Sequence, residues 1–155
     1  MPQTIVFFVE TRTDEQSVAL CRWVDHFYEQ GKRVQVVASS SVAAQHLDQL
    51  MWTFAQGSFI PHRIGSSGQP GLAVEPVIIT VGEAPVKGAA VVLSDGPLSL
   101  DFMQGFDTVV HFVLLDDAEK RLNSRSLWQA ARERGIQVNH IAYVSKGRVF
   151  PSIPK

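Results

Sequence analysis

The order in which apolar runs and amphipathic segments alternate constrains the fold of this chain more than any other feature. Residues 4–9 form a continuous apolar, β-branched and aromatic run, which is typical of a strand buried on both faces. A helical pattern over about 13–30 follows, then a second strand at 33–38 and a second helix over about 39–52. This strand–helix–strand–helix order predicts a parallel sheet with helices packed on its faces.

Residues at the ends of the two helices support this interpretation. Thr13 or Asp14 can cap the first helix, Gly31 can end it, and a serine among 39–41 can cap the second. The helical spacing of the second segment predicts that Val42 faces the core.

The rest of the chain continues the same pattern after a loop rich in glycine and serine at 65–71. Strands are predicted at 77–81, 89–93, 108–113 and 137–144, and a helix at 116–134. No internal repeat or linker interrupts them. We therefore expect an α/β fold made of one three-layer domain over 1–155, with a mostly parallel sheet flanked by helices. Residues from about 139 to 155 are expected to form a C-terminal strand followed by an irregular tail.

Composition limits the class of protein. With 45% apolar and 19% charged residues, the chain can bury a core and is not disordered. No run approaches the ~20 apolar residues that a membrane-spanning helix needs, and the N-terminus lacks the cationic segment of a signal peptide. The single cysteine, Cys21, can form neither an internal disulfide nor a zinc cluster. We expect a soluble, cytoplasmic protein.

The motifs of common enzyme sites do not occur. The 65–71 loop lacks the Gly-Lys-Ser/Thr ending of a phosphate-binding loop, and Glu10-Thr11-Arg12-Thr13 follows the first strand where a dinucleotide site needs glycines. The five histidines are too dispersed to suggest a metal site, and we expect His111, inside an apolar strand, to be a hydrogen-bonded core residue. Cys21 lies on the apolar face of its helix, which favours a packed thiol. We predict no catalytic residue, metal or cofactor.

Charge is distributed unevenly along the chain. Residues 1–119 carry 6 basic and 14 acidic side chains, a balance of −8, whereas residues 120–155 carry 8 basic and 1 acidic, a balance of +7. A basic segment of this kind suggests a face that binds an anionic ligand, such as nucleic acid, phosphate or an acidic peptide. The alternative is that both signs of charge are simply solvated.

The basic residues of the last predicted helix follow a helical spacing. Arg121, Arg125, Trp128 and Arg132 are separated by 4, 3 and 4 positions, which places them within roughly 60° of arc. Guanidinium groups beside an indole suit a ligand with carboxylates and an aromatic or apolar end. The alternative is a solvated arginine face with Trp128 packed in the core.

Large apolar residues also gather where the second helix should end. Trp52 and Phe54 precede Phe59-Ile60-Pro61, and proline prevents this second group from continuing the helix. The segment either fills the core or presents an apolar patch to a partner, and the residues alone do not decide between these.

At these positions the sequence resembles the chi subunit of the bacterial DNA polymerase III holoenzyme, an accessory protein of the clamp loader. The order of strands and helices fits along almost the whole chain. The residues that carry the resemblance are Leu47-Asp48…Leu50…Trp52, Ser58-Phe59-Ile60-Pro61-His62, Pro76-Val77-x-Ile79 and Arg125-x-x-Trp128-x-x-x-Arg132-x-x-Gly135.

The resemblance implies a single α/β domain, Rossmann-like or P-loop-like in topology without nucleotide motifs, and a non-catalytic adaptor. It implies two partners: the psi subunit, and the acidic, Phe-ending C-terminal tail of single-stranded DNA-binding protein. An iron–sulfur helicase is a possible competitor of psi. The tail-binding residues that the resemblance implies are Val113, Arg125, Trp128 and Arg132, with Lys120 or Arg121 as the first basic residue, and those for psi are Trp52, Phe59 and Pro61.

Two other functions are weighed against the adaptor. A small α/β enzyme or nucleotide-binding domain would use the basic C-terminal helix to hold a phosphate, but it lacks the motifs. Direct DNA binding is expected to be weak at most, because a net charge of −1 argues against a large phosphate footprint.

Overall fold

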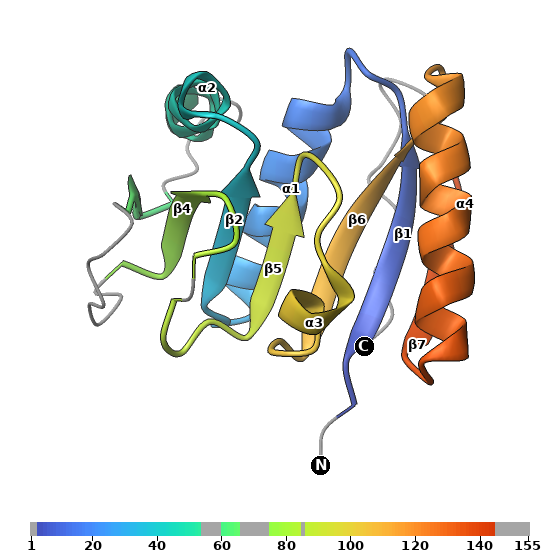
Figure 1. Cartoon of the computed structure of the whole chain (residues 1–155). Coiled ribbons are helices and arrows are strands. Elements are labelled where there is room, and N and C mark those ends of the chain that lie inside the picture. Colours follow the sequence, from blue (N-terminus) through green and yellow to red (C-terminus); the bar gives the residue numbers. More distant parts are fainter. Residues whose placement is uncertain (1–2, 54–59, 66–74, 85, 145–155) are drawn as a thin grey trace.

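The computed structural model describes residues 3–53, 60–65, 75–84 and 86–144, and all statements below concern these residues. Strands and helices alternate along much of the chain (Figure 1). The helices are α1 (Gln16–Glu29), α2 (Ser41–Thr53), α3 (Leu100–Met103) and α4 (Ala118–Glu133). The strands are β1 (Ile5–Thr11), β2 (Val34–Ala38), β3 (His62–Ile64), β4 (Val77–Val81), β5 (Val91–Ser94), β6 (Thr108–Leu114) and β7 (Gln137–Ile141).

All strands form one sheet with the order β3-β4-β2-β5-β6-β1-β7. Every neighbouring pair is parallel, so the predicted, mostly parallel sheet is confirmed as a wholly parallel one. β1 lies between β6 and β7, and it pairs with β6 along its whole length and with β7 from Ile5 to Val9.

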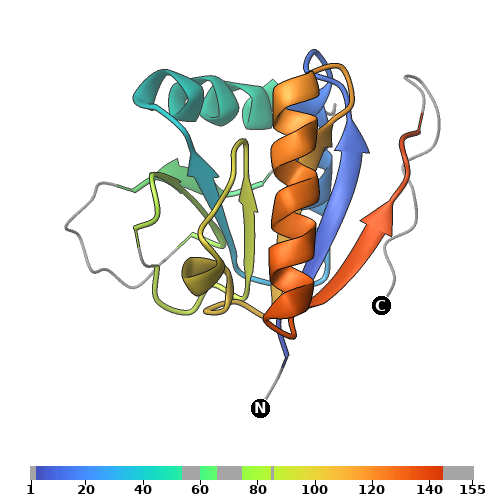
Figure 2. The ribbon, with the colours of Figure 1, turned by 45° about the vertical axis from the view of Figure 1, so that its right-hand side comes forward.

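Side chains of alternate residues along β1 point to opposite faces of the sheet. Phe7 and Val9 belong to a core formed with α1 and α2, whereas Val6 and Phe8 belong to a second core formed with α3 and α4. The helices thus cover the sheet on both sides, as the three-layer prediction required (Figures 1 and 2).

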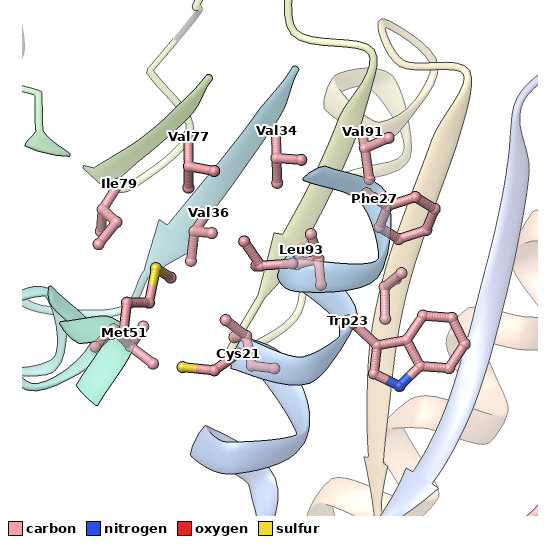
Figure 3. Packing of buried hydrophobic residues seen from close by; sticks show 14 of the residues in the cluster. Cys21, Trp23, Phe27, Val34, Val36, Met51, Val77, Ile79, Val91 and Leu93 are labelled. Carbon is pink, nitrogen blue, oxygen red and sulfur yellow. The ribbon is translucent and has the colours of Figure 1, made fainter. Parts of the chain in front are cut away.

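The first core is built on the buried face of α1. Trp23 and Phe27 lie over the sheet, and Met51 joins them from α2 (Figure 3). Cys21 is completely buried here, and burial raises the pKa of its thiol to about 12. The prediction of a packed, unreactive thiol is confirmed.

The predicted cap of the first helix is wrong. Glu15 occupies the N-cap position of α1 and makes no side-chain capping bond. Thr13 cannot serve, because its backbone N–H and hydroxyl both donate to Asp116 Oδ1, each at 2.9 Å. In α2 the serine prediction holds, since Ser40 Oγ accepts from the N–H of Ala43. Gly31 ends α1 with a φ of 75°, as glycine readily does.

Other differences have simple physical reasons. Val42 was predicted to face the core but is 77% exposed, because it lies in the first turn of α2, away from the sheet. The short elements β3 and α3 were not predicted, since three or four residues carry too little periodicity. The last strand ends at Ile141, before the predicted residue 144, and the predicted tail beyond 144 lies outside the described residues.

Within the described residues, no helix has the length and apolar character to cross a membrane.

His111 is a hydrogen-bonded core residue, as predicted. It is buried in β6, and its Nε2 lies 2.8 Å from Ser124 Oγ of α4. Burial lowers the pKa of His111 from 6.5 to about 4, because a buried imidazolium would lose its hydration. The ring is therefore neutral in the native protein at physiological pH.

This histidine should make the free energy of unfolding fall in acid. Below about pH 6.5 His111 binds a proton in the unfolded chain but not in the native protein. The free energy of unfolding therefore falls with pH until the native pKa of about 4 is reached. Between about pH 7 and about pH 5, wild type should lose about 2 kcal/mol more stability than His111→Gln, which keeps a partner for Ser124. Urea denaturation at both pH values measures this, and equal losses would contradict it.

Candidate functional site

The candidate site is built on α4, which packs across β6 and β7 on one face of the sheet (Figure 2). Asp117 caps its N-terminus by accepting from the N–H of Lys120 at 3.0 Å. Glu119 in the first turn and Arg132 in the last complement the helix dipole. Gly135, with a φ of 84°, closes the helix.

The inner side of α4 combines buried small residues with one aromatic residue. Ser124 and Ala131 are buried. Trp128 is half-buried and makes an edge-on contact with Phe8, with ring centroids 5.0 Å apart. The indole therefore packs against the second core yet keeps part of its surface accessible, which combines the two alternatives left open by the sequence.

Three arginines follow the same side of the helix. Arg121, Arg125 and Arg132 are exposed, and in the described part of the chain no ion pair or hydrogen bond holds their guanidinium groups. By contrast, Nη1 of Arg134 forms an ion pair with Asp101 Oδ1 at 2.6 Å. The stripe therefore has guanidinium groups available to carboxylates that come from outside the domain.

Helical geometry separates Lys120 from this stripe. Consecutive residues lie about 100° apart around a helix, so Lys120 points well away from the direction of Arg121. Arg121 acts electrostatically on Glu10 of β1, on the side of the helix where Trp128 meets Phe8. The geometry favours Arg121 as the first basic residue of the stripe.

Val113 lies below this helix. It is half-buried in β6 and packs against the second core, as does Trp128. The structure therefore places the apolar side chain of Val113 and the indole of Trp128 on the same face of the sheet. Both apolar and cationic groups of the expected peptide site occur on this side of the domain.

Three polar residues near Val113 and Trp128 were not among the predicted site residues: Glu10, His140 and Tyr143. Glu10 accepts from the N–H of Tyr143 at 3.0 Å, and its Oε2 lies 2.9 Å from His140 Nε2. Burial alone would raise the pKa of Glu10, but the bonds from His140 and Tyr143, with the nearby Arg121, lower it below its usual value. The predicted first strand ended at residue 9, two residues before the observed end of β1 at Thr11, so Glu10 was not placed on the sheet.

The carboxyl edge of the sheet contains two points where neighbouring strands lead to helices on opposite faces. Ligands of open α/β sheets bind at such points. Between β1 and β6, Asp116 accepts from Thr13, and between β2 and β5, Asp95 Oδ2 accepts from Ser39 Oγ at 3.1 Å. Each point thus carries a carboxylate of the protein itself, which is unfavourable for a phosphate.

A second surface lies at the end of α2. Trp52 is 48% exposed, and its ring centroid lies 4.5 Å from that of His62. His62 is itself buried, with Nδ1 2.6 Å from Ile60 O and Nε2 3.0 Å from Asp48 O. Ile60 fills the core at 1% exposure, whereas Trp52, at the end of α2, presents an aromatic ring at the surface.

The other two residues predicted for this surface are only partly located. Pro61 is half-buried beside Ile60 and His62. Phe59 lies outside the described residues. Within the described ranges, no group of three or more histidine, cysteine or acidic side chains could hold a metal ion.

Comparisons with known proteins agree with the resemblance seen in the sequence. The model of the family described as DNA polymerase III chi subunit, HolC, matches residues 1–139. DNA polymerase III subunit chi of Escherichia coli (strain K12) is 30% identical over 121 residues, which cover 77% of this chain and 80% of that protein. The protein of the same name from Haemophilus influenzae is 24% identical over 138 residues, covering 87% of this chain and 94% of that protein.

The N-cap of α4 should contribute measurably to stability. Asp117→Ala removes the acceptor for the N–H of Lys120 and should cost about 1 kcal/mol of the free energy of unfolding. Asp117→Ser retains a capping oxygen and should cost much less. Urea denaturation compares the two variants, and equal destabilisation would argue against the capping role.

Proposed function

The chain belongs to the DNA polymerase III chi subunit family, and from this premise we propose that it is an adaptor that binds an acidic peptide on α4 and a protein partner around Trp52. Chi is a non-catalytic accessory subunit of DNA polymerase III. In our proposal the peptide is the C-terminal tail of single-stranded DNA-binding protein and the partner is the psi subunit. The adaptor would act in the bacterial cytoplasm.

The observation that carries the peptide site is the stripe of exposed arginines beside a half-buried indole. In the described part of the chain the guanidinium groups of Arg121, Arg125 and Arg132 make no hydrogen bond or ion pair, so they can pair with the carboxylates of an acidic tail. Trp128 and Val113 offer apolar surface for a terminal phenylalanine. Together these contacts can supply about 6–8 kcal/mol, which corresponds to micromolar affinity.

The proposed partner site is centred on Trp52, an exposed aromatic residue whose ring packs against the buried His62. Trp52 leaves about half of its surface accessible, and the buried His62 supports its ring from below. Exposed tryptophan held by a packed neighbour is typical of the anchors of protein interfaces. Pro61 and Phe59 complete the proposed surface for psi, and an iron–sulfur helicase is the proposed competitor for it.

A nucleotide-binding enzyme is the weaker alternative. The carboxylates of Asp116 and Asp95 lie at the two points of the carboxyl edge where a phosphate would be expected. A thermal-shift screen with mononucleotides tests this alternative, and clear stabilisation by one of them would revive it. Direct contact of the arginine stripe with DNA is expected to be weak.

The first experiment is calorimetric titration with a ten-residue acidic peptide ending in Asp-Ile-Pro-Phe, at low and high salt. Binding should be micromolar and should weaken with salt, because exposed charges are screened over ~8 Å at physiological ionic strength. Removal of the terminal Phe should abolish it. Absence of binding at low salt would overturn the peptide site.

Substitution of the central arginine tests the position of the site. Arg125→Ala should weaken peptide binding more than about tenfold without unfolding the protein, because an exposed charge-assisted contact is lost. Arg134→Ala is the matched control: this arginine is held by Asp101 and should leave affinity unchanged. Trp128→Ala should also weaken binding, although lost packing on Phe8 will lower stability as well. Wild-type affinity in Arg125→Ala would refute the assignment to α4.

The partner surface is tested by co-purification with psi. Phe59→Ala and Trp52→Ala should abolish co-purification and spare peptide binding, because Trp52 lies at the end of α2 and the arginine stripe lies on α4. Val42→Ala, at a position on the same α2 helix that is 77% exposed, serves as the control. Retention of psi by both aromatic variants would return these residues to a structural role.

A further inference from the structure

The proposed peptide site contains a carboxylate of its own, and this is unexpected for a surface that binds an acidic ligand. Glu10 lies on the floor beside the apolar residue Val113, its partner in the parallel pairing of β1 with β6. We propose that the Glu10–His140 pair sets the affinity of this site for acidic peptides, and that peptide binding is coupled to protonation of His140. This inference rests on the proposed peptide site.

The strand register places the pair within the site. Cα partners on neighbouring strands direct their side chains to the same face of the sheet. His140 of β7 is the Cα partner of Phe8. The ring of Phe8 contacts that of Trp128, which lies beside the arginines of α4, with ring centroids 5.0 Å apart. Glu10 lies two residues beyond Phe8 on the same strand, and therefore on the same face.

The hydrogen bonds leave the charge of the pair dependent on His140 alone. Glu10 uses Oε1 to accept from the N–H of Tyr143 and Oε2 to meet His140 Nε2. When the His140 imidazole is neutral, the Glu10–His140 pair has a net charge of −1, which repels an incoming carboxylate. With its imidazole protonated, the two charges cancel and the guanidinium group of Arg121 acts without opposition.

The other titratable groups around the pair do not change this conclusion. From α4, Arg121 faces Glu10 and is always charged. Glu15, before α1, accepts from the Tyr143 hydroxyl at 2.7 Å. From β6, buried His111 stays neutral. His140 is half exposed and contacts Glu10 directly, and imidazole is the side-chain group whose charge ordinarily changes near neutral pH.

The sign of the coupling follows from charge. An acidic peptide adds negative charge beside His140 and favours the imidazolium over the neutral ring. By reciprocity, protonation of His140 favours the bound peptide by the same factor. Binding should therefore take up a proton, and affinity should rise as pH falls.

Calorimetry with the same acidic peptide tests this in two buffers that differ in ionisation enthalpy, at about pH 6 and about pH 8. Peptide aspartates stay ionised at both, since their pKa is about 3.9. Wild type should bind roughly five- to tenfold more tightly at the lower pH, as expected for charges several ångströms apart near a protein surface, and should take up protons. His140→Gln should bind equally at both values with no proton uptake.

Two further variants complete the design. Glu10→Gln keeps an acceptor for Tyr143 and should tighten binding roughly fivefold at the higher pH, because it removes the opposing charge. His46→Gln, exposed on α2, is the control and should behave as wild type. Thermal unfolding of each variant checks that the fold is retained.

The outcomes separate this inference from the proposed function. Salt-sensitive binding without proton uptake, with the same affinity at both pH values, would overturn the role of the pair and leave the peptide site standing. A pH effect that persists in His140→Gln would also overturn it. Absence of binding in wild type at both pH values would overturn the inference together with the peptide site.

Discussion

The structure depends on β1, which is buried on both faces of the sheet and has a neighbouring strand on each side. β1 pairs in parallel with β6 and β7, so its backbone polar groups are satisfied by two neighbours. Phe7 and Val9 fill one core while Val6 and Phe8 fill the other, all at 5% exposure or less. Because one strand serves both cores, the two helical layers cannot form independently of each other.

The same strand positions the candidate peptide site. Phe8 supports Trp128, and His111 on the neighbouring strand bonds to Ser124, so α4 is held by its inner side through contacts that use no arginine. The guanidinium groups are left for an external anion. Glu10, at the end of this strand, brings a carboxylate onto the floor, where it can oppose or permit the ligand according to its partner His140.

The fold has the layers and crossovers of nucleotide-binding domains, yet its carboxyl edge is arranged differently. Glycine-rich phosphate loops are absent from the sequence, and Asp116 and Asp95 instead bond to the turns that follow β1 and β2. These carboxylates tie neighbouring strand ends together and make the edge unfavourable for phosphate. The surfaces proposed for binding lie elsewhere, along α4 and at the end of α2, as suits the proposed adaptor.

The sequence by itself determined the parallel α/β class and every element of more than four residues, because long apolar runs and helical spacing are local signals. It also determined the spacing of the α4 arginines. Only the tertiary structure decided that Trp128 both packs and remains accessible, that Val42 faces solvent, and that Thr13 bonds to Asp116 instead of capping α1. It alone brought Glu10 and His140 together, 130 residues apart in the chain. Contacts of this kind depend on strand order and register, which no local pattern encodes.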